Sequence, residues 1–145
     1  MVGKRFMASR ANLDHKRAMS RPRIKVFFDG GCRPNPGAIE AAAVIRGEAH
    51  VFADLGHGTN HDAEWTALVK ALDLATSLGF RDIELIGDAL PVVRQANAAL
   101  KRGSALDRHE AAFLDLCRDA PPGRIRWIKR EQNLAGIALA RRHPR

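Results

Sequence analysis

Apolar residues recur along this chain with two spacings, one typical of strands and the other of helices. Short apolar runs bounded by glycine, proline or polar residues predict strands over residues 24–28, 41–46, 50–55, 83–86 and 124–128. Helical spacing and capping residues predict helices over residues 59–78, 91–100, 107–118 and 133–142. Three strands come first, and strands and helices then alternate, which indicates an α/β fold with a mixed sheet flanked by helices.

Residues 1–22 show no sustained apolar period, so we interpret them as a flexible, basic N-terminal tail before one domain over residues 23–145. Residues 1–23 hold seven basic residues and one acidic residue, whereas residues 24–145 hold 17 and 15, so most of the net charge of +8 lies in the tail. The tail is either a solvated extension or an arm that attracts phosphates, and a transit segment or a physiological start at Met19 are further alternatives. No apolar run approaches the ~20 residues needed to cross a bilayer, so we expect no membrane partner.

Three acidic residues occupy positions where an acid is unusual. Asp29 and Asp88 directly follow apolar strands, and ligands bind beyond the carboxyl ends of strands in α/β sheets. Glu64 lies on the apolar face of its predicted helix, because Leu68 and Leu72 follow it at helical spacing. Taken singly, the three acids have ordinary explanations as a turn former, a helix cap and a half-exposed helix residue. Together they predict a divalent-metal site, and oxygen ligands suit Mg²⁺ or Mn²⁺ rather than zinc.

Four segments resemble, in order, the motifs of the ribonuclease H family. They are F-D-G-G-C-R-P-N-P-G at 28–37, T-N-H-D-A-E at 59–64, I-G-D at 86–88 followed by V-V at 92–93, and K-R-E-Q-N at 129–133. The resemblance covers residues 24–142, nearly the whole predicted domain. The chain thus resembles ribonuclease HI and the ribonuclease H domain of reverse transcriptases.

The resemblance implies a five-stranded mixed sheet, with three antiparallel strands first and parallel strands after them, flanked by helices. It also implies endonucleolytic hydrolysis of RNA in RNA–DNA hybrids by two Mg²⁺ or Mn²⁺ ions, which leaves 5′-phosphate and 3′-hydroxyl ends. By position, the resemblance assigns Asp29, Glu64 and Asp88 to metal binding and catalysis, with Asp29 bridging both ions. It assigns Asn35 and Asn60 to the minor groove near the 2′-hydroxyls, where a protein distinguishes RNA from DNA.

The sequence departs from the family in the last helix, which usually supplies a fourth carboxylate. Counted from Asn133, Ile137 holds that position, and isoleucine cannot ligate a metal. Glu131 and His143 are nearby alternatives, and the sequence gives no geometric support for either. Two functions are therefore open: a ribonuclease H-type endoribonuclease with reduced activity, or a nucleic-acid-binding module of the same fold with weak or no nuclease activity.

The segment between Lys101 and Asp107 is too short for the basic insertion of some family members. We expect Lys101 and Arg102 to contact the substrate in part of its place. We further expect a monomer that acts in the cytoplasm, since two cysteines without a CxxC pair suit a reducing compartment. A nuclease of the same fold with another substrate, such as DNA, is a third hypothesis.

Overall fold

The computed structural model describes residues 23–143, so the predictions for the N-terminal tail lie outside the described residues. The main sheet has the spatial order β3-β2-β1-β5-β6 and mixes both strand directions, since β1–β2 and β2–β3 pair antiparallel while β1–β5 and β5–β6 pair parallel. These strands are β1 (Ile24–Cys32), β2 (Gly37–Ile45), β3 (Glu48–Phe52), β5 (Ile83–Gly87) and β6 (Arg124–Trp127). The predicted α/β class with a mixed sheet is confirmed.

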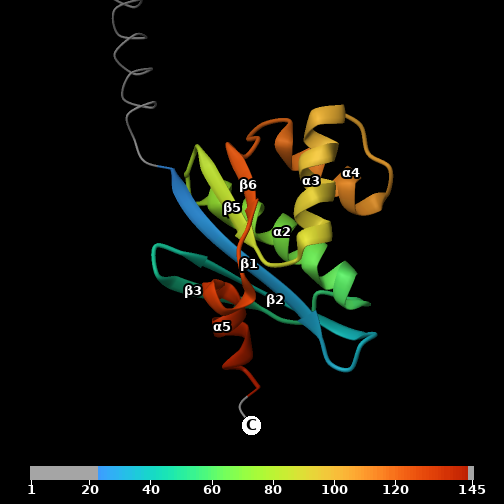
Figure 1. The fold of residues 1–145 in the computed structure, drawn as a ribbon, viewed down its shortest axis with the longest axis vertical. Coiled ribbons are helices and arrows are strands. Elements are labelled where there is room, and N and C mark those ends of the chain that lie inside the picture. The colour runs from blue at the N-terminus through green and yellow to red at the C-terminus, as the bar shows by residue number, and fades with distance from the viewer. Residues whose placement is uncertain (1–22, 144–145) are drawn as a thin grey trace, which may run out of the picture.

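Helices cover both faces of this sheet. They are α2 (Asn60–Ser77), α3 (Leu90–Arg102), α4 (Arg108–Cys117) and α5 (Leu134–Ala140), with a 3₁₀ turn η1 (Arg130–Gln132) before the last. Figure 1 shows α2 behind the sheet with α3 and α4 beside it, whereas α5 lies across the opposite face. Within residues 23–143, no helix is both long and apolar enough to cross a bilayer.

Capping contacts lie at three of the four predicted helix starts, and α3 begins at Leu90 without a side-chain cap. Thr59 caps α2 in a capping box with Asp62, Asp107 caps α4, and Asn133 caps α5. These contacts join residues two or three positions apart, so the local sequence contains the information that sets them. The C-terminal bounds differ slightly, and α3 continues to Arg102 because Gly103 adopts the left-handed conformation that ends a helix.

Strand β1 is longer than the sequence predicts. We expected it to end at Phe28, with a loop over residues 30–37, but it continues through Asp29 to Cys32. The reason is its partner, because β2 begins at Gly37 and pairs with β1 as far as the Cys32–Ile39 pair. Glycine-rich segments have low strand propensity of their own, and a neighbouring strand overrides that propensity here. The short strand β4 (His57–Gly58), which the sequence did not predict, pairs with β2 in the same way.

The two larger of three apolar clusters among residues 23–143 lie on the two faces of the sheet. Alternate residues of β1 face opposite sides, so Phe28 packs with Trp65 and Leu68 of α2 in the larger core. The smaller core joins the other face to α5 and contains Ala42, Val44, Ala135 and Leu139. Asp29 pairs with Ala42 and therefore lies on the α5 side of the sheet.

The backbone of β1 approaches α2 closely at Gly30. A Cβ atom there would lie 2.1 Å from the carbonyl oxygen of Ala63, a separation that no side chain tolerates. The Gly30 N–H donates to Glu64 Oε1 at 2.6 Å, so the same contact fixes the first turn of the helix beside the strand. Gly87 allows a second close approach, since a Cβ atom there would lie 2.4 Å from Cζ of Phe28.

The N-terminal end of α5 is fixed by Asn133, whose side chain is fully buried. Its Oδ1 accepts from the Ala135 N–H, which is the capping contact. Its Nδ2 donates to the Phe28 carbonyl at 3.0 Å and to Asp88 Oδ2 at 2.8 Å. One side chain thus joins the last helix, the central strand and the end of β5.

Replacing Gly30 with alanine tests the close approach of β1 to α2. Because the added methyl group would meet backbone atoms of Ala63, we expect Gly30→Ala to lower the free energy of unfolding by about 1–3 kcal/mol or more. Gly31→Ala is the matched control, since its Cβ would meet only a Leu139 methyl at 4.0 Å. Urea denaturation of both variants measures the difference, and equal midpoints would contradict the packing argument.

Candidate metal centre and active site

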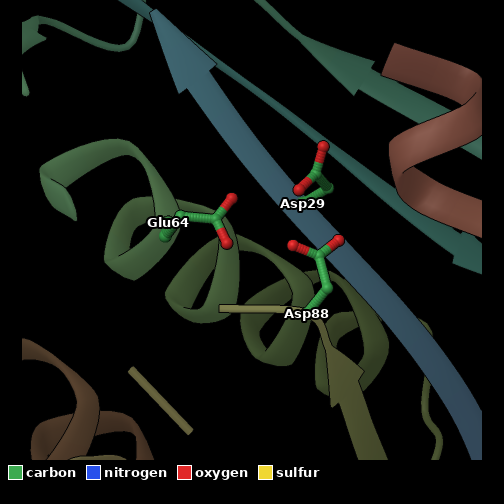
Figure 2. A group of neighbouring side chains, drawn as sticks. All are labelled: Asp29, Glu64 and Asp88. Atoms are coloured by element: carbon green, nitrogen blue, oxygen red, sulfur yellow. The ribbon is translucent and has the colours of Figure 1, made fainter. Parts of the chain in front are cut away.

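Three acidic side chains from distant parts of the chain meet beside β1 and the end of β5. Asp29 lies in β1, Glu64 lies in the first turns of α2, and Asp88 follows β5 directly. One carboxylate oxygen from each lies within 4.8 Å of the other two. Figure 2 shows the three carboxylates turned toward one another, with Glu64 reaching across from its helix. The structure therefore brings together the three acids that the sequence singled out.

The immediate contacts hold two of these acids in place and leave one oxygen without a partner. Glu64 is only 9% exposed, and its Oε1 accepts from the Gly30 N–H. Its Oε2 is buried and has no hydrogen-bond partner among the residues that the structure describes. Asp88 Oδ2 accepts from the Asn133 amide. A buried carboxylate oxygen without a donor is costly when it is ionised, so Glu64 must either keep a proton or bind a cation at this place.

The local electrostatics lead to the same conclusion. Burial raises the pKa of Glu64 far above its ordinary range, and the nearby charge of Asp29 raises it further. Burial also raises the pKa of Asp29, and the negative charge of Asp88 adds to this effect, whereas a hydrogen bond with Glu64 and the positive charge of Arg130 lower it. The three acids therefore resist being ionised together in the absence of a cation.

A hard divalent cation fits this site. All three ligand atoms are carboxylate oxygens, which suit Mg²⁺ or Mn²⁺ and not the sulphur- and nitrogen-rich sites of structural zinc. The unpartnered Oε2 of Glu64 offers a ligand atom that no protein donor occupies among residues 23–143. A cation would allow Asp29 and Glu64 to ionise together at neutral pH, since it lowers the pKa of both.

The acids line a cavity of about 450 Å³ that also contains basic side chains. Arg33 and Arg130 lie on its wall, and sequence reasoning did not single out either residue. The available signal was position, because Arg33 lies inside the first-strand motif and Arg130 lies just before α5. The cavity thus combines metal-binding oxygens with guanidinium groups, which bind phosphate well.

The predicted substrate-binding asparagines lie at or beside this cavity. Asn60 lines it, and the Asn60 N–H donates to Asn35 Oδ1 at 3.1 Å. The Asn60 side-chain oxygen accepts from the Cys32 N–H at 3.3 Å. Because their oxygens have partners, the amide nitrogens are the groups that these residues can offer as hydrogen-bond donors to a ligand.

The other two predicted substrate contacts lie elsewhere. Lys101 and Arg102 occupy the C-terminal end of α3, and neither is among the described residues that line the cavity. Arg102 forms an ion pair with the buried Glu110, and its Nε also donates to the Ser104 carbonyl. This arginine connects α3 to α4. Lys101 is exposed, so it remains available to contact a long ligand outside the cavity.

The α5 side of the cavity has no carboxylate on its helix. Ile137, which the sequence count assigned to the fourth acid, is 41% exposed and is not among the described lining residues. Gly136 lines the cavity instead, and a Cβ atom there would lie 3.5 Å from Asp29 Oδ2 and 3.8 Å from Asp88 Oδ2. A side chain at position 136 would therefore point at Asp29 and Asp88, whereas the assignment of Ile137 to the fourth-acid position stays a prediction.

Comparison with known protein families identifies a match over nearly all of the described chain. The family described as reverse transcriptase-like matches residues 27–143. Among curated proteins, the chain is similar to ribonuclease HI of Halobacterium salinarum, with 39% identity over 82 residues. This match covers 53% of the present chain and 41% of that relative, so it spans less than half of the relative's length.

Solved structures extend the similarity to the whole fold. Ribonuclease H1 of the halophilic archaeon Halobacterium salinarum matches with a TM-score of 0.61 and 31% identity, over 81% of this chain and 94% of the other. LC11-RNase H1, solved in complex with an RNA/DNA hybrid, matches with a TM-score of 0.64 and 26% identity, over 81% and 93% of the two chains. With the family match and the three converging acids, these similarities show that the chain belongs to the ribonuclease H family.

Proposed function

We propose that this protein is a divalent-metal-dependent endoribonuclease that hydrolyses the RNA strand of RNA–DNA hybrids, leaving 5′-phosphate and 3′-hydroxyl ends. The observation that carries the proposal is the meeting of Asp29, Glu64 and Asp88 around a buried, unpartnered carboxylate oxygen. Family membership supports the choice of reaction, because the similar proteins are ribonucleases H.

Asp29, Glu64 and Asp88 would hold Mg²⁺ or Mn²⁺, and we expect two ions when substrate is bound. When bound, such ions activate a water for attack on phosphorus and stabilise the leaving 3′ oxygen. The chain's own part is to keep the carboxylates converged. Gly30 and Asn133 do so through their hydrogen bonds to Glu64 and Asp88.

The residues around the acids suit a nucleic-acid substrate. Arg33 and Arg130 would contact the negatively charged backbone beside the scissile phosphate. The amides of Asn35 and Asn60 would donate to the 2′-hydroxyls or base edges of the minor groove. A similar protein, LC11-RNase H1, has been solved with an RNA/DNA hybrid, which supports the same class of substrate here. A monomeric state and a cytoplasmic location stay predictions.

The alternative is a module of the same fold that binds nucleic acid with weak or no cleavage. The observation that favours it is the missing acid on α5, where glycine occupies the position that faces Asp29 and Asp88. Mg²⁺ keeps several of its waters in protein sites, so three carboxylates are sufficient to bind it. We therefore rank the enzyme first.

A cleavage assay decides between these two functions. An end-labelled RNA–DNA hybrid is incubated with the protein in Mg²⁺ and in Mn²⁺, beside Asp29→Asn. We expect cleavage by the wild-type protein and a loss of more than about 100-fold in the variant, which lacks a direct metal ligand. Binding of the hybrid without cleavage under either metal would instead establish the binding module.

The raised pKa of Glu64 predicts how stability depends on pH. The folded protein keeps a proton on Glu64 at pH values where the unfolded chain, with its ordinary pKa of 4.5, has released it. This contribution to stability is therefore complete below the ordinary pKa and is lost as pH rises toward the raised one. Mg²⁺ replaces the proton, so its stabilising effect should increase with pH.

Thermal unfolding in EDTA and in Mg²⁺, from about pH 5 to about pH 8, measures this linkage. We expect the shift in Tm that Mg²⁺ produces to become larger at higher pH. In the control Glu64→Gln, which has no proton to exchange, most of this pH dependence should disappear. A Mg²⁺ shift that is constant over the range would show that Glu64 is already ionised in the metal-free protein.

Restoring an acid on α5 tests which position faces the site. We expect Gly136→Asp to raise the cleavage rate at limiting Mg²⁺ by about tenfold, or about 1.4 kcal/mol in the barrier. Ile137→Asp is the matched comparison, and its effect should be small because Ile137 is largely exposed. A larger gain from Ile137→Asp would mean that α5 is rotated by one residue in the active protein.

A further inference from the structure

The last helix and the turn after it present four residues to the cavity, and none of them is acidic. Gly136, Leu139 and Ala140 line the α5 side, and His143 follows in the next turn. The helix itself, Leu134–Ala140, contains no ionisable residue. Any negative charge on this side of the cavity must therefore come from another element.

Glu40 of β2 occupies this side of the cavity. The strand register pairs Asp29 with Ala42 and Gly31 with Glu40, so Glu40 and Asp29 are diagonal neighbours on the same face of the sheet. Diagonal neighbours on antiparallel strands are ~7–8 Å apart, which is within reach of a long side chain. Glu40 thus lies beside Asp29, on the side of the cavity that α5 covers.

Two basic residues hold the Glu40 carboxylate. His143 Nε2 lies within hydrogen-bond distance of Oε1, and Arg142 Nε donates to Oε2 at 3.1 Å. The Glu40 side chain is only 13% exposed, so these partners keep a mostly buried carboxylate in one orientation. A purely structural role would be to fasten the end of α5 to β2. The shared cavity with Asp29 and Glu64 indicates more than that.

We infer that Glu40 supplies, from β2, the carboxylate that the last helix lacks, and that it helps to bind divalent ions on the α5 side of Asp29. This inference rests on the proposed function for its consequence in cleavage. Glu40 is not in the group of acids whose ligand atoms lie within 4.8 Å of one another, so it acts through intervening water. Mg²⁺ retains water ligands that can donate to such a carboxylate.

Two independent observations support a ligand at this place. Glu64 Oε2 is buried without a partner among the described residues, which indicates that a cation belongs in the cavity. Gly136 has no side chain, and a Cβ atom on it would point at Asp29. The absence of that side chain leaves space between α5 and Asp29. With a fourth carboxylate, the total negative charge of the site would also match the total positive charge of two divalent ions more nearly.

In this arrangement, Arg142 and His143 are positioning residues. Both pair with Glu40 and not with any of the three acids, so they act by orienting the carboxylate of Glu40. Outer partners of this kind typically change metal affinity or activity by ~10–100-fold when removed. The effect of losing one of the two cations should be smaller than the effect of losing Glu40 itself.

The test compares Glu40→Gln with Glu48→Gln, which removes an exposed glutamate at the start of β3, outside the cavity lining. Calorimetric titration of the metal-free proteins with Mn²⁺ gives the affinity, and the Mg²⁺ dependence of hybrid cleavage gives a second measure. We expect Glu40→Gln to weaken Mn²⁺ binding and to raise the Mg²⁺ concentration for half-maximal cleavage by about tenfold or more. Glu48→Gln should match the wild type in both, and hybrid binding in EDTA should be the same for all three.

Mn²⁺ affinity that is the same in Glu40→Gln and the wild type would overturn the inference and leave Glu40 a structural link. If Glu40→Gln does not fold, His143→Gln provides the test, because it keeps Glu40 and its contact with Arg142. It should weaken Mn²⁺ binding by several-fold, and no change would again overturn the inference. Adding Gly136→Asp to Glu40→Gln should restore the Mg²⁺ response, which a structural defect in β2 would not allow.

These outcomes are distinct from a failure of the proposed function. A wild-type protein that binds Mn²⁺ but cleaves no hybrid would refute the endoribonuclease. The comparison of Mn²⁺ affinities between wild type and Glu40→Gln would still decide the role of Glu40. Conversely, cleavage that needs Asp29 and not Glu40 would keep the enzyme and remove the inference.

Discussion

The contact between Gly30 and the first turns of α2 determines where the acids of this protein lie. Without a side chain at Gly30, the backbone of β1 reaches the backbone of Ala63, and its N–H donates to Glu64. Asp29 directly precedes Gly30 in the strand, so the same contact places the Asp29 carboxylate beside that of Glu64. The cost of the arrangement is electrostatic, because buried carboxylates then face one another and their pKa values rise. A cation relieves that cost, and packing and chemistry are therefore linked at one glycine.

The other wall of the cavity depends on how α5 is attached. Its apolar contact with the sheet is small, and polar contacts fix the two ends of the segment. Asn133 connects the N-terminal end to Phe28 and Asp88, and residues just after the helix contact Glu40 on β2. The helix therefore spans the cavity between two fixed points, and its rotation decides which residue faces Asp29. Because Gly136 has no side chain, α5 leaves space beside Asp29, and the negative charge on this side of the cavity is that of Glu40 in β2.

The sequence predicted the elements well where the signals are local. The N-caps Thr59, Asp107 and Asn133 act on residues two or three positions away, and each lies where the sequence predicted its helix to begin. The extension of β1 through Gly30 and Gly31 was missed, because its cause is a partner strand and not the glycine-rich segment itself. Arg102 illustrates the same limit, since nothing near it in the sequence indicates that Glu110 is buried and pairs with it.

The sequence by itself singled out the three acids that the structure brings together, because an acid after an apolar run or on an apolar helix face is unusual and can be recognised locally. Only the tertiary structure decided what surrounds them. Successive helix residues are about 100° apart, so the exposed Ile137 and the cavity-lining Gly136 point in different directions, and only the folded helix shows which of them lines the cavity. The place of Glu40 beside Asp29 depends on the register between β1 and β2. Strand register and helix rotation result from packing between distant segments, so the local sequence pattern does not predict them.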